Sequence, residues 1–373
     1  MMIFFLIALF SSGIIFVLLL GHLIQLRRIK KYPPTTQFSV AVIVPCKGNS
    51  DPNFGENLRG IIQQAYTGPV KFIFCVESHT DLALSVLRQL AQEFACVEVC
   101  VAGLSTRSSQ KNHNILCGMQ QADEADIYLL ADADIEPHPT WLSEMVAPFQ
   151  ETGVGAVTGC FRRIPVSKEF QLGAYLAGLF GAGIAAGMAD NVLGGLWGGS
   201  LALRRSVVDQ YNLRQRLASE IVDDIALMHA FRQHKLERRF VPGCTLKSYC
   251  DMSAPDSIEW LVRQFQFTQI YFKGLYLFFY LFGLPYALSI LMTPLLLVYG
   301  VVMADPLAIG ASLAFWLSVM VVGWLLRLGI TVNPASIAPG DFEYRWLPWL
   351  LVTPLAFLGG LLALLKTLLR VKN

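Results

Sequence analysis

Long apolar stretches at both ends of the 373-residue chain constrain its fold more than any other feature. Residues 2–26 form the first stretch, and three more follow in the C-terminal part, over 275–301, 306–330 and 347–369. About 20 consecutive apolar residues suffice to cross a bilayer as a helix. Most charged residues lie between these ends, within residues 27–270. The sequence therefore predicts a membrane protein with a folded domain in its middle.

Composition excludes several classes of protein. Only 15% of the residues are charged and 54% are hydrophobic, whereas ordinary soluble domains carry about 25% charged residues. Neither a disordered chain nor a disulfide-rich secreted mini-domain has such a composition. The net charge of +2, without a long Lys/Arg block, gives no reason to expect a nucleic-acid partner. The eight cysteines include no CxxC pair, so we interpret them as small buried hydrophobic residues rather than as zinc ligands or a network of disulfides.

The first apolar stretch predicts an uncleaved anchor. A basic cluster within residues 27–31 follows it, no positive segment precedes it, and no small-residue cleavage site ends it. The positive-inside rule then places the N-terminus outside and the following domain in the cytoplasm, at the inner membrane if the source is bacterial. Three C-terminal crossings would leave Lys366, Arg370 and Lys372 outside, and one non-crossing stretch would return them inside. Three and four spans both remain open.

The middle of the chain alternates between strand-like and helix-like segments. Short β-branched and aromatic runs predict strands over 39–44, 70–76, 96–101, 126–131 and 154–159. Helical patterns lie between them, over 54–65, 80–94 and 111–121. Such alternation is typical of βαβ units with a parallel sheet, in which ligands bind at the carboxyl ends of the strands.

Acidic residues follow two of these strands. Glu77 and Asp81 come after the second strand, and Asp132 and Asp134 come after the fourth. Buried carboxylates are costly unless a partner compensates them, and a divalent cation does so while also binding substrate phosphates. A lone DxD often only caps a helix or turns a loop. The strand before it and the Pro-rich turn after it favour a metal site.

A second acidic pair, Asp223 and Asp224, precedes a helical pattern. Acids at this position also favour the helix dipole, so the pair has a structural interpretation beside a chemical one. The histidines show no ligand spacing among themselves, and we interpret each as structural or solvated; they include His79, His113, His138 and His229.

Three segments together carry a resemblance to a known family. VPCKGNSDPNFGENLRGIIQQAY, FIFCVESHTD and KNHNILCGMQQADEADIYLLADADIEPHPTWLSEMV resemble family 2 and family 21 glycosyltransferases of GT-A fold. The most similar type is the ceramide glucosyltransferase, including bacterial hopanoid-associated relatives, and GGLWGGSLALRRSVVDQ and EIVDDIALMHAFRQHKLERRF continue the match in order. The resemblance implies an α/β, Rossmann-like GT-A domain flanked by transmembrane helices. Its expected parts are an anchor over 1–31, a cytoplasmic catalytic domain over 32–272 and C-terminal membrane helices over 273–373.

The same resemblance implies roles for the acidic residues. Asp81 matches the first family aspartate, near the nucleotide base and ribose. Asp132 and Asp134 match the DxD pair that binds Mg²⁺ or Mn²⁺ on the nucleotide-sugar diphosphate. Asp224, with Asp223 beside it, matches the candidate general base.

The last family signature, (Q/R)xxRW, is altered in this chain. Arg263 is kept, but Gln266 and Phe267 stand where Arg and Trp are expected. Glutamine can still donate hydrogen bonds to a phosphate but brings no charge, and Phe offers a smaller stacking face. The full set of candidate donor-binding residues is Lys47, Glu77, Asp81, Lys111, Asp132, Arg263 and Gln266. Lys47 could instead simply form a turn, and Lys111 could be a solvated lysine.

The acceptor side is predicted from position along the chain. Residues 171–203 are almost chargeless and rich in Gly, Ala and Leu, which favours a bilayer-facing surface or an acceptor groove, with ordinary core packing as the alternative. A spanning helix there would separate Asp223 from Asp132 across the membrane. Residues 258–272 mix aromatic residues with Arg263, as expected of an interfacial helix.

Together these features predict a membrane-bound inverting glycosyltransferase of glycolipid biosynthesis, which moves one sugar from a UDP-sugar to a lipid hydroxyl of ceramide or hopanoid type. One alternative is a processive polysaccharide synthase of the cellulose or hyaluronan type, and the small C-terminal helix set argues against it. A catalytically silent scaffold with a degenerate nucleotide site is the other, and the intact acidic pairs argue against it.

Overall fold

The computed structural model describes residues 2–48, 53–122, 124–166, 171–189, 194–249, 251–331 and 346–370. The chain divides into two compact units. The sheet unit comprises residues 29–162 and 190–248, and the helical unit comprises residues 1–28, 163–189 and 249–373. Two segments within the expected 32–272 domain, 163–189 and 249–272, therefore belong to the helical unit by their contacts.

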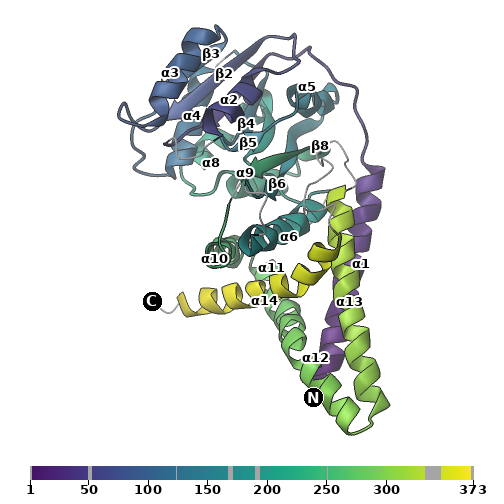
Figure 1. The fold of residues 1–373 in the computed structure, drawn as a ribbon. Coiled ribbons are helices and arrows are strands. Elements are labelled where there is room, and N and C mark those ends of the chain that lie inside the picture. The colour runs from purple at the N-terminus through teal and green to yellow at the C-terminus, as the bar shows by residue number, and fades with distance from the viewer. Residues whose placement is uncertain are drawn as a thin grey trace. The chain divides into compact units, whose positions relative to one another are not determined.

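In the described part of the chain, the sheet unit is built on a mixed sheet of eight strands in the order β3-β2-β1-β4-β7-β6-β8-β5 (Figure 1). The first half of that order consists of β3 (Val97–Val101), β2 (Val70–Val76), β1 (Val40–Pro45) and β4 (Ile127–Ala131). These strands pair in parallel. The second half consists of β7 (Ser200–Arg204), β6 (Val154–Ile164), β8 (Glu237–Tyr249) and β5 (Ile135–Glu136). Here β7 is antiparallel to both β4 and β6, and β5 is antiparallel to β8.

The predicted parallel sheet is therefore correct for one half only. Each of the five predicted strands has a counterpart, but the fifth, within β6, lies in the antiparallel half. The sequence analysis missed β5, β7 and β8. β5 has two residues, and β8 is interrupted by Pro242 and Gly243 and begins with charged residues, so neither forms a continuous apolar run.

Helices cover both faces of the sheet. One face carries α2 (Phe54–Ile62), α3 (Ala83–Glu93), α5 (Trp141–Val146) and the 3₁₀ turn Ala147–Gln150; the other carries α4 (Gln110–Gln121), α7 (Arg205–Gln210), α8 (Leu213–Leu217) and α9 (Asp223–Gln233). Successive strand residues alternate between the two cores, so Val42 and Val44 face one and Ala41 and Ile43 face the other. Burial on both faces explains why the parallel strands read as continuous apolar runs.

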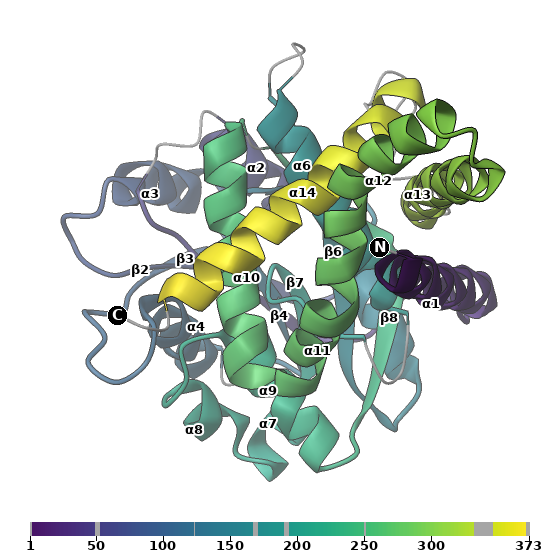
Figure 2. The same cartoon turned by 90° about the horizontal axis from the view of Figure 1, so that it is seen from below.

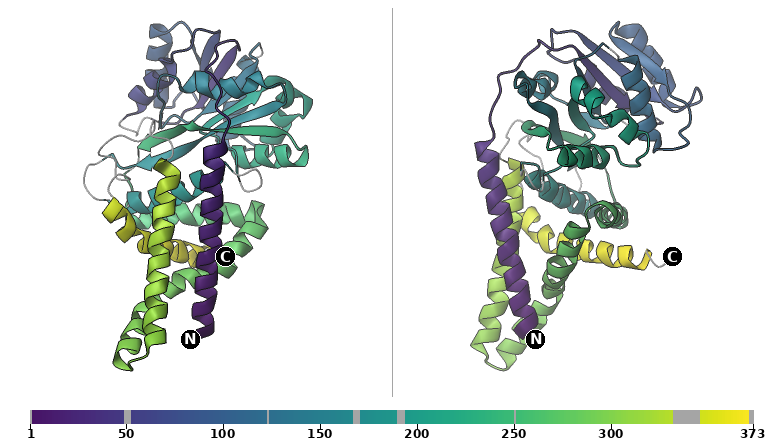
Figure 3. Two further views of the ribbon diagram at one scale, coloured as in Figure 1. Left: turned by 90° about the vertical axis from the view of Figure 1, so that its right-hand side faces the viewer. Right: turned by 180° about the vertical axis from the view of Figure 1, so that it is seen from behind.

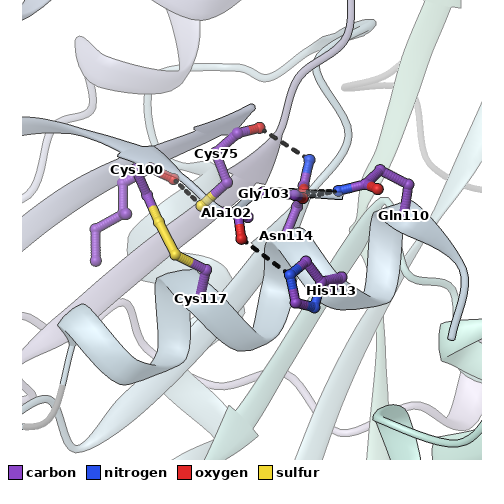
Figure 4. The surroundings of a disulfide bond; sticks show 9 residues. Cys75, Cys100, Ala102, Gly103, Gln110, His113, Asn114 and Cys117 are labelled. Atoms are coloured by element: carbon purple, nitrogen blue, oxygen red, sulfur yellow. Dashed lines mark hydrogen bonds between the residues drawn. A yellow bond between two sulfur atoms is a disulfide. The ribbon is translucent and has the colours of Figure 1, made fainter. Parts of the chain in front are cut away.

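A disulfide links α4 to the sheet (Figure 4). Cys100 on β3 pairs with Cys117 on α4, and His113 Nε2 lies 2.9 Å from the carbonyl oxygen of Ala102. The interpretation of the cysteines as unpaired is therefore wrong for these two, because packing of a helix on a strand brings together thiols whose spacing in sequence gives no sign of it. The free cysteines of the described residues are Cys46, Cys75, Cys96, Cys160 and Cys244.

The helical unit contains α1 (Met2–Arg28), α6 (Leu172–Gly187), α10 (Ala254–Tyr271), α11 (Lys273–Phe278), the π-helical turn Phe279–Gly283, α12 (Leu284–Val302), α13 (Pro306–Thr331) and α14 (Trp346–Arg370). By length and composition, four segments among the described residues could cross a membrane: Leu6–Arg28, Lys273–Val302, Pro306–Leu328 and Val352–Arg370. These match the four apolar stretches of the sequence. α6 is apolar but shorter than such a span.

Candidate active site

Asp132 and Asp134 directly follow β4, where the parallel half of the sheet meets the antiparallel half. The Asp132 N–H donates to the carbonyl oxygen of Gly199, which precedes β7, over 3.2 Å. Ser248 Oγ on β8 donates to Asp134 Oδ2 over 2.9 Å. Both acidic residues are half-buried. The antiparallel half thus holds the backbone of Asp132 and the carboxylate of Asp134.

Lys111 on α4 joins this pair to the second acidic pair. Its ammonium lies 2.8 Å from Asp132 Oδ1 and 3.1 Å from Asp223 Oδ2. Because one ammonium contacts both carboxylates, they lie within a few ångströms of each other although 91 residues separate them in sequence. Burial by itself would lower the pKa of Lys111, but the carboxylates of Asp132 and Asp223 raise it overall. The lysine therefore stays charged and offsets part of their repulsion.

Asp223 and Asp224 begin α9, and their surroundings strongly shift the pKa of Asp224. Asp223 is buried. Asp224 Oδ2 accepts a long hydrogen bond of 3.4 Å from the N–H of Gly198. Burial, followed by repulsion from Asp223, raises the pKa of Asp224 to about 7, although Lys111 acts in the opposite direction. A carboxylate whose pKa lies near neutrality can both accept and release a proton around pH 7.

Two consecutive glycines, Gly198 and Gly199, lie in close contact with one acid of each pair. A Cβ atom at Gly198 would lie 2.0 Å from Asp223 Oδ2, and one at Gly199 would lie 2.6 Å from Asp132 Oδ2. No real side chain tolerates such distances without displacing the carboxylates. The absence of side chains at both positions therefore lets the backbone before β7 approach the acids.

The loops after β1 and β2 carry three more of the predicted donor-binding residues, Lys47, Glu77 and Asp81. Asp81 Oδ1 accepts hydrogen bonds from the backbone N–H groups of Gly48 and Ala83, each over 2.9 Å. Gly48 has φ +62°, a conformation that favours glycine. Lys47 lies 3.3 Å from Glu77 in an exposed ion pair. Asp81 thus shapes the loop after β1, while Asp51 and Pro52 of the family-like motif lie outside the described residues.

Arg263 and Gln266 lie on α10 of the helical unit, where Arg263 is exposed and Gln266 is half-buried. Their role in donor binding stays a prediction. Neighbouring Phe265 packs edge to face on Phe180 of α6, with ring centroids 6.1 Å apart.

A further group of potential metal ligands, His138, Glu144 and Cys244, comes within 4.8 Å of one another. Each already has a protein partner. His138 Nε2 lies 3.1 Å from Gly243 O, Glu144 accepts from Thr140 and the Cys244 thiol faces the Trp141 carbonyl. The interpretation of His138 as structural or solvated stays a prediction.

Sequence reasoning missed the residues that orient the acids. Asn112, fully buried beside Lys111, donates to the carbonyl oxygens of Leu217 and Glu220 and so ties α4 to the segment leading into α9. Gly198, Gly199 and Ser248 were likewise not singled out. The sequence signal for the two glycines is their adjacent position before β7, inside the nearly chargeless segment 171–203.

The fold and this site define a class of protein. A mixed sheet that gathers acidic residues at the carboxyl ends of its strands is the arrangement of GT-A nucleotide-sugar transferases. The structure of a mannosyltransferase from Pyrobaculum calidifontis in complex with GDP-Man and Mn²⁺ is similar over 98% of this chain and 99% of its own, with a TM-score of 0.53 and 17% identity. That likeness shows the GT-A fold.

The family follows from the sequence. The model of glycosyl transferase family 21 matches residues 3–363, and the chain belongs to this family. Glucosyl-3-phosphoglycerate synthase from Mycobacterium tuberculosis, solved with Mn²⁺ and UDP-glucose, matches 61% of this chain and 78% of its own at 17% identity and a TM-score of 0.40. No curated protein matches the chain.

Proposed function

We propose that this protein is an integral membrane enzyme that transfers one sugar from a UDP-sugar to a lipid hydroxyl, with inversion at the anomeric carbon. Family membership and the GT-A fold support the glycosyl transfer. Four apolar helices support a multi-pass membrane location, and the basic cluster after α1 supports a cytoplasmic catalytic domain.

One observation carries the proposal: Lys111 contacts both Asp132 and Asp223. It brings the DxD pair and the candidate base to one place at the strand ends, where a nucleotide sugar would lie. A scaffold without catalysis has no need to hold these acids together, because each adds repulsion and desolvation cost.

The donor set fits a divalent cation. Asp132 and Asp134 are half-buried carboxylates two residues apart at a strand end, and hard cations such as Mg²⁺ and Mn²⁺ bind such oxygens together with phosphates. When bound, the cation neutralises the charge of the departing diphosphate. Ser248 orients the Asp134 carboxylate, and the Gly199 carbonyl holds the backbone of Asp132.

Asp224 accepts the proton of the attacking lipid hydroxyl. Its raised pKa places it near the pH at which a base both binds and releases a proton readily. Asp223 holds Lys111 and raises the basicity of Asp224 by repulsion. A single displacement from the side of this base inverts the anomeric configuration.

The remaining candidates contact the donor. We assign contact with the nucleotide base and ribose to Asp81, as the family resemblance implies, together with the loop after β1 that it holds. We assign diphosphate contacts to Lys47 and Lys111 and, from α10, to Arg263 and Gln266; Glu77 orients Lys47. The acceptor is a lipid of ceramide or hopanoid type, because the motif from Lys47 to Leu58 resembles that branch and the helical unit is apolar.

The test uses the full chain in detergent with Mg²⁺ or Mn²⁺. Labelled UDP-glucose, UDP-N-acetylglucosamine and GDP-mannose are each supplied with ceramide or a hopanoid polyol, and the product is identified by mass. We expect a lipid carrying one added sugar from a UDP donor. A polymeric product, transfer only from GDP-mannose, or UDP binding without transfer from any donor would each overturn the proposal.

A further inference from the structure

The long apolar helices of the helical unit do not all run in one direction. α1, α12 and α13 run side by side, whereas α14 runs across them, beside α6 and α10 (Figures 1 and 3). Figure 2, seen from below, shows α14 crossing in front of α10. If α1, α12 and α13 cross a bilayer, α14 lies in its plane, although its length and composition would also suit a span.

One face of α14 is packed against protein. Its buried residues include Val352, Ala356, Ala363, Leu364 and Thr367. Several of the contacts of α14 are with α10 and α6. At the edge of this face, Lys366 and Arg370 both contact the carboxylate of Glu259 on α10, over 2.9 and 2.8 Å. α14 is thus held to α10 along one side.

The opposite face of α14 is an exposed stripe of leucines. The stripe consists of Leu355, Leu362, Leu365 and Leu369, which are 42–68% exposed. At 100° per residue these positions fall within one arc of about 80°, with Lys366 and Arg370 on its flank. Apolar side chains lining one face next to basic residues are the pattern of a helix lying in a membrane interface.

The charges at the two ends of the α1, α12 and α13 bundle indicate which end faces the cytoplasm. Between residues 274 and 326 the sequence has no Lys or Arg, so the turn Met303–Asp305 carries none. The N-terminus lies beside that turn (Figure 3). Arg27, Lys273 and Arg327 all lie toward the other end. The positive-inside rule makes that end cytoplasmic.

We propose that α14 is a membrane-surface helix whose leucine stripe lies among the lipids of the cytoplasmic leaflet, so that the chain has three spans and a cytoplasmic C-terminus. This topology keeps Lys366 and Arg370 on the same side as Arg27, whereas a fourth span would carry them across. The inference depends on the membrane location in the proposed function, but not on its chemistry.

Depth measurements in vesicles test this arrangement directly. Nitroxide labels on cysteines placed at Leu355, Leu362 and Leu369 are compared for exposure to oxygen and to a polar relaxation agent in phosphatidylcholine vesicles containing phosphatidylglycerol. A surface helix gives one shared shallow depth. A spanning helix gives depths that differ by about 10 Å from each label to the next. Wild-type protein treated with the same reagent corrects for native cysteines.

Labels at Leu307 and Leu317 on α13 are the matched control. We expect their depths to differ by about 15 Å, as in a spanning helix. If the labels on α13 show no burial in the membrane, the membrane location itself is wrong. If α13 spans while the α14 labels differ in steps, or are shielded from both agents as in a protein interface, the surface-helix proposal is overturned and the membrane location stands.

Discussion

The two halves of the sheet contribute differently to the site. The parallel half, β3-β2-β1-β4, ends in the residues with chemical character, Asp81 and the Asp132–Asp134 pair. The antiparallel half, β7-β6-β8-β5, and the segment before β7 offer partners to the acids: the Gly199 carbonyl accepts from the Asp132 N–H, the Ser248 hydroxyl donates to Asp134, and the Gly198 N–H donates to Asp224.

One half of the sheet therefore carries reactive groups, and the other half supplies groups that hold them. The parallel half by itself places the DxD acids at a strand end, because they directly follow β4 in the sequence. The direction of the Asp134 carboxylate depends on Ser248 of β8, and the backbone of Asp132 is held by the Gly199 carbonyl before β7. Substitutions in the two halves should therefore have different signatures, which the following experiments compare from the largest expected effect to the smallest.

Removing the candidate base should have the largest effect. Asp224→Asn keeps the shape of the side chain but cannot accept the hydroxyl proton, so we expect kcat to fall by about 10²–10⁴-fold without a lower unfolding temperature. Asp209→Asn, at an exposed acid paired with Arg205, is the matched control and should keep full activity. Wild-type turnover by Asp224→Asn would move the base role to Asp223.

Gly198→Ala tests the orienting half. The new methyl group would lie 2.0 Å from Asp223 Oδ2 and must displace that carboxylate, so we expect activity to fall by about 100-fold. Gly60→Ala serves as the control, because its Cβ would meet only Pro137 Cδ at 3.7 Å. Equal activities for the two variants would show that the backbone before β7 does not position the acids.

Lys111→Met should change the pH dependence. Because Asp224 must be deprotonated to act, activity falls as the pH drops through its pKa, which is raised to about 7. Lys111 lowers that pKa, so its loss should move the acid limb of the kcat profile to higher pH by about 1–3 units. A limb that stays in place would show that another group titrates.

The same raised pKa has a consequence for stability. The folded protein binds the Asp224 proton more tightly than the unfolded chain does. This group therefore stabilises the fold most below the ordinary pKa of an aspartate, and that contribution is lost as the pH rises toward 7. Thermal unfolding of wild-type protein and Asp224→Asn at pH 5 and pH 8 measures this difference.

Ser248→Ala should have a smaller effect, on cation binding. Loss of the hydrogen bond to Asp134 leaves the carboxylate in place but less well oriented. We expect affinity for Mn²⁺ to fall by about tenfold, with a loss of about 1 kcal/mol in the free energy of unfolding. Titration with Mn²⁺ in the presence of UDP measures the affinity, and Ser85→Ala, which alters an exposed helical serine, is the control.

The smallest effect on stability belongs to Lys47. Its side chain is 76% exposed and pairs with Glu77 in solvent, so Lys47→Ala should change the free energy of unfolding by less than about 1 kcal/mol. If Lys47 contacts the diphosphate, the KM for the UDP-sugar rises while stability stays the same. An unchanged KM would limit Lys47 to the surface ion pair.

The sequence by itself determined the apolar stretches long enough to cross a membrane, five of the sheet's strands with the helices between the first four, and the identity of the acidic residues. These features depend on local patterns: apolar length, a continuous run in a strand buried on both faces, and acids placed where a strand ends. The resemblance from Lys47 onward also indicated the family correctly.

Tertiary structure alone decided which groups meet. The contact of Lys111 with both Asp132 and Asp223, the Cys100–Cys117 disulfide and the approach of Gly198 to the acids join residues far apart in the chain. The packing of α14 across α10 is likewise decided only by the tertiary structure. Periodicity records which face of an element is buried, but the partner on that face is set by how the elements pack, and no local pattern encodes that choice.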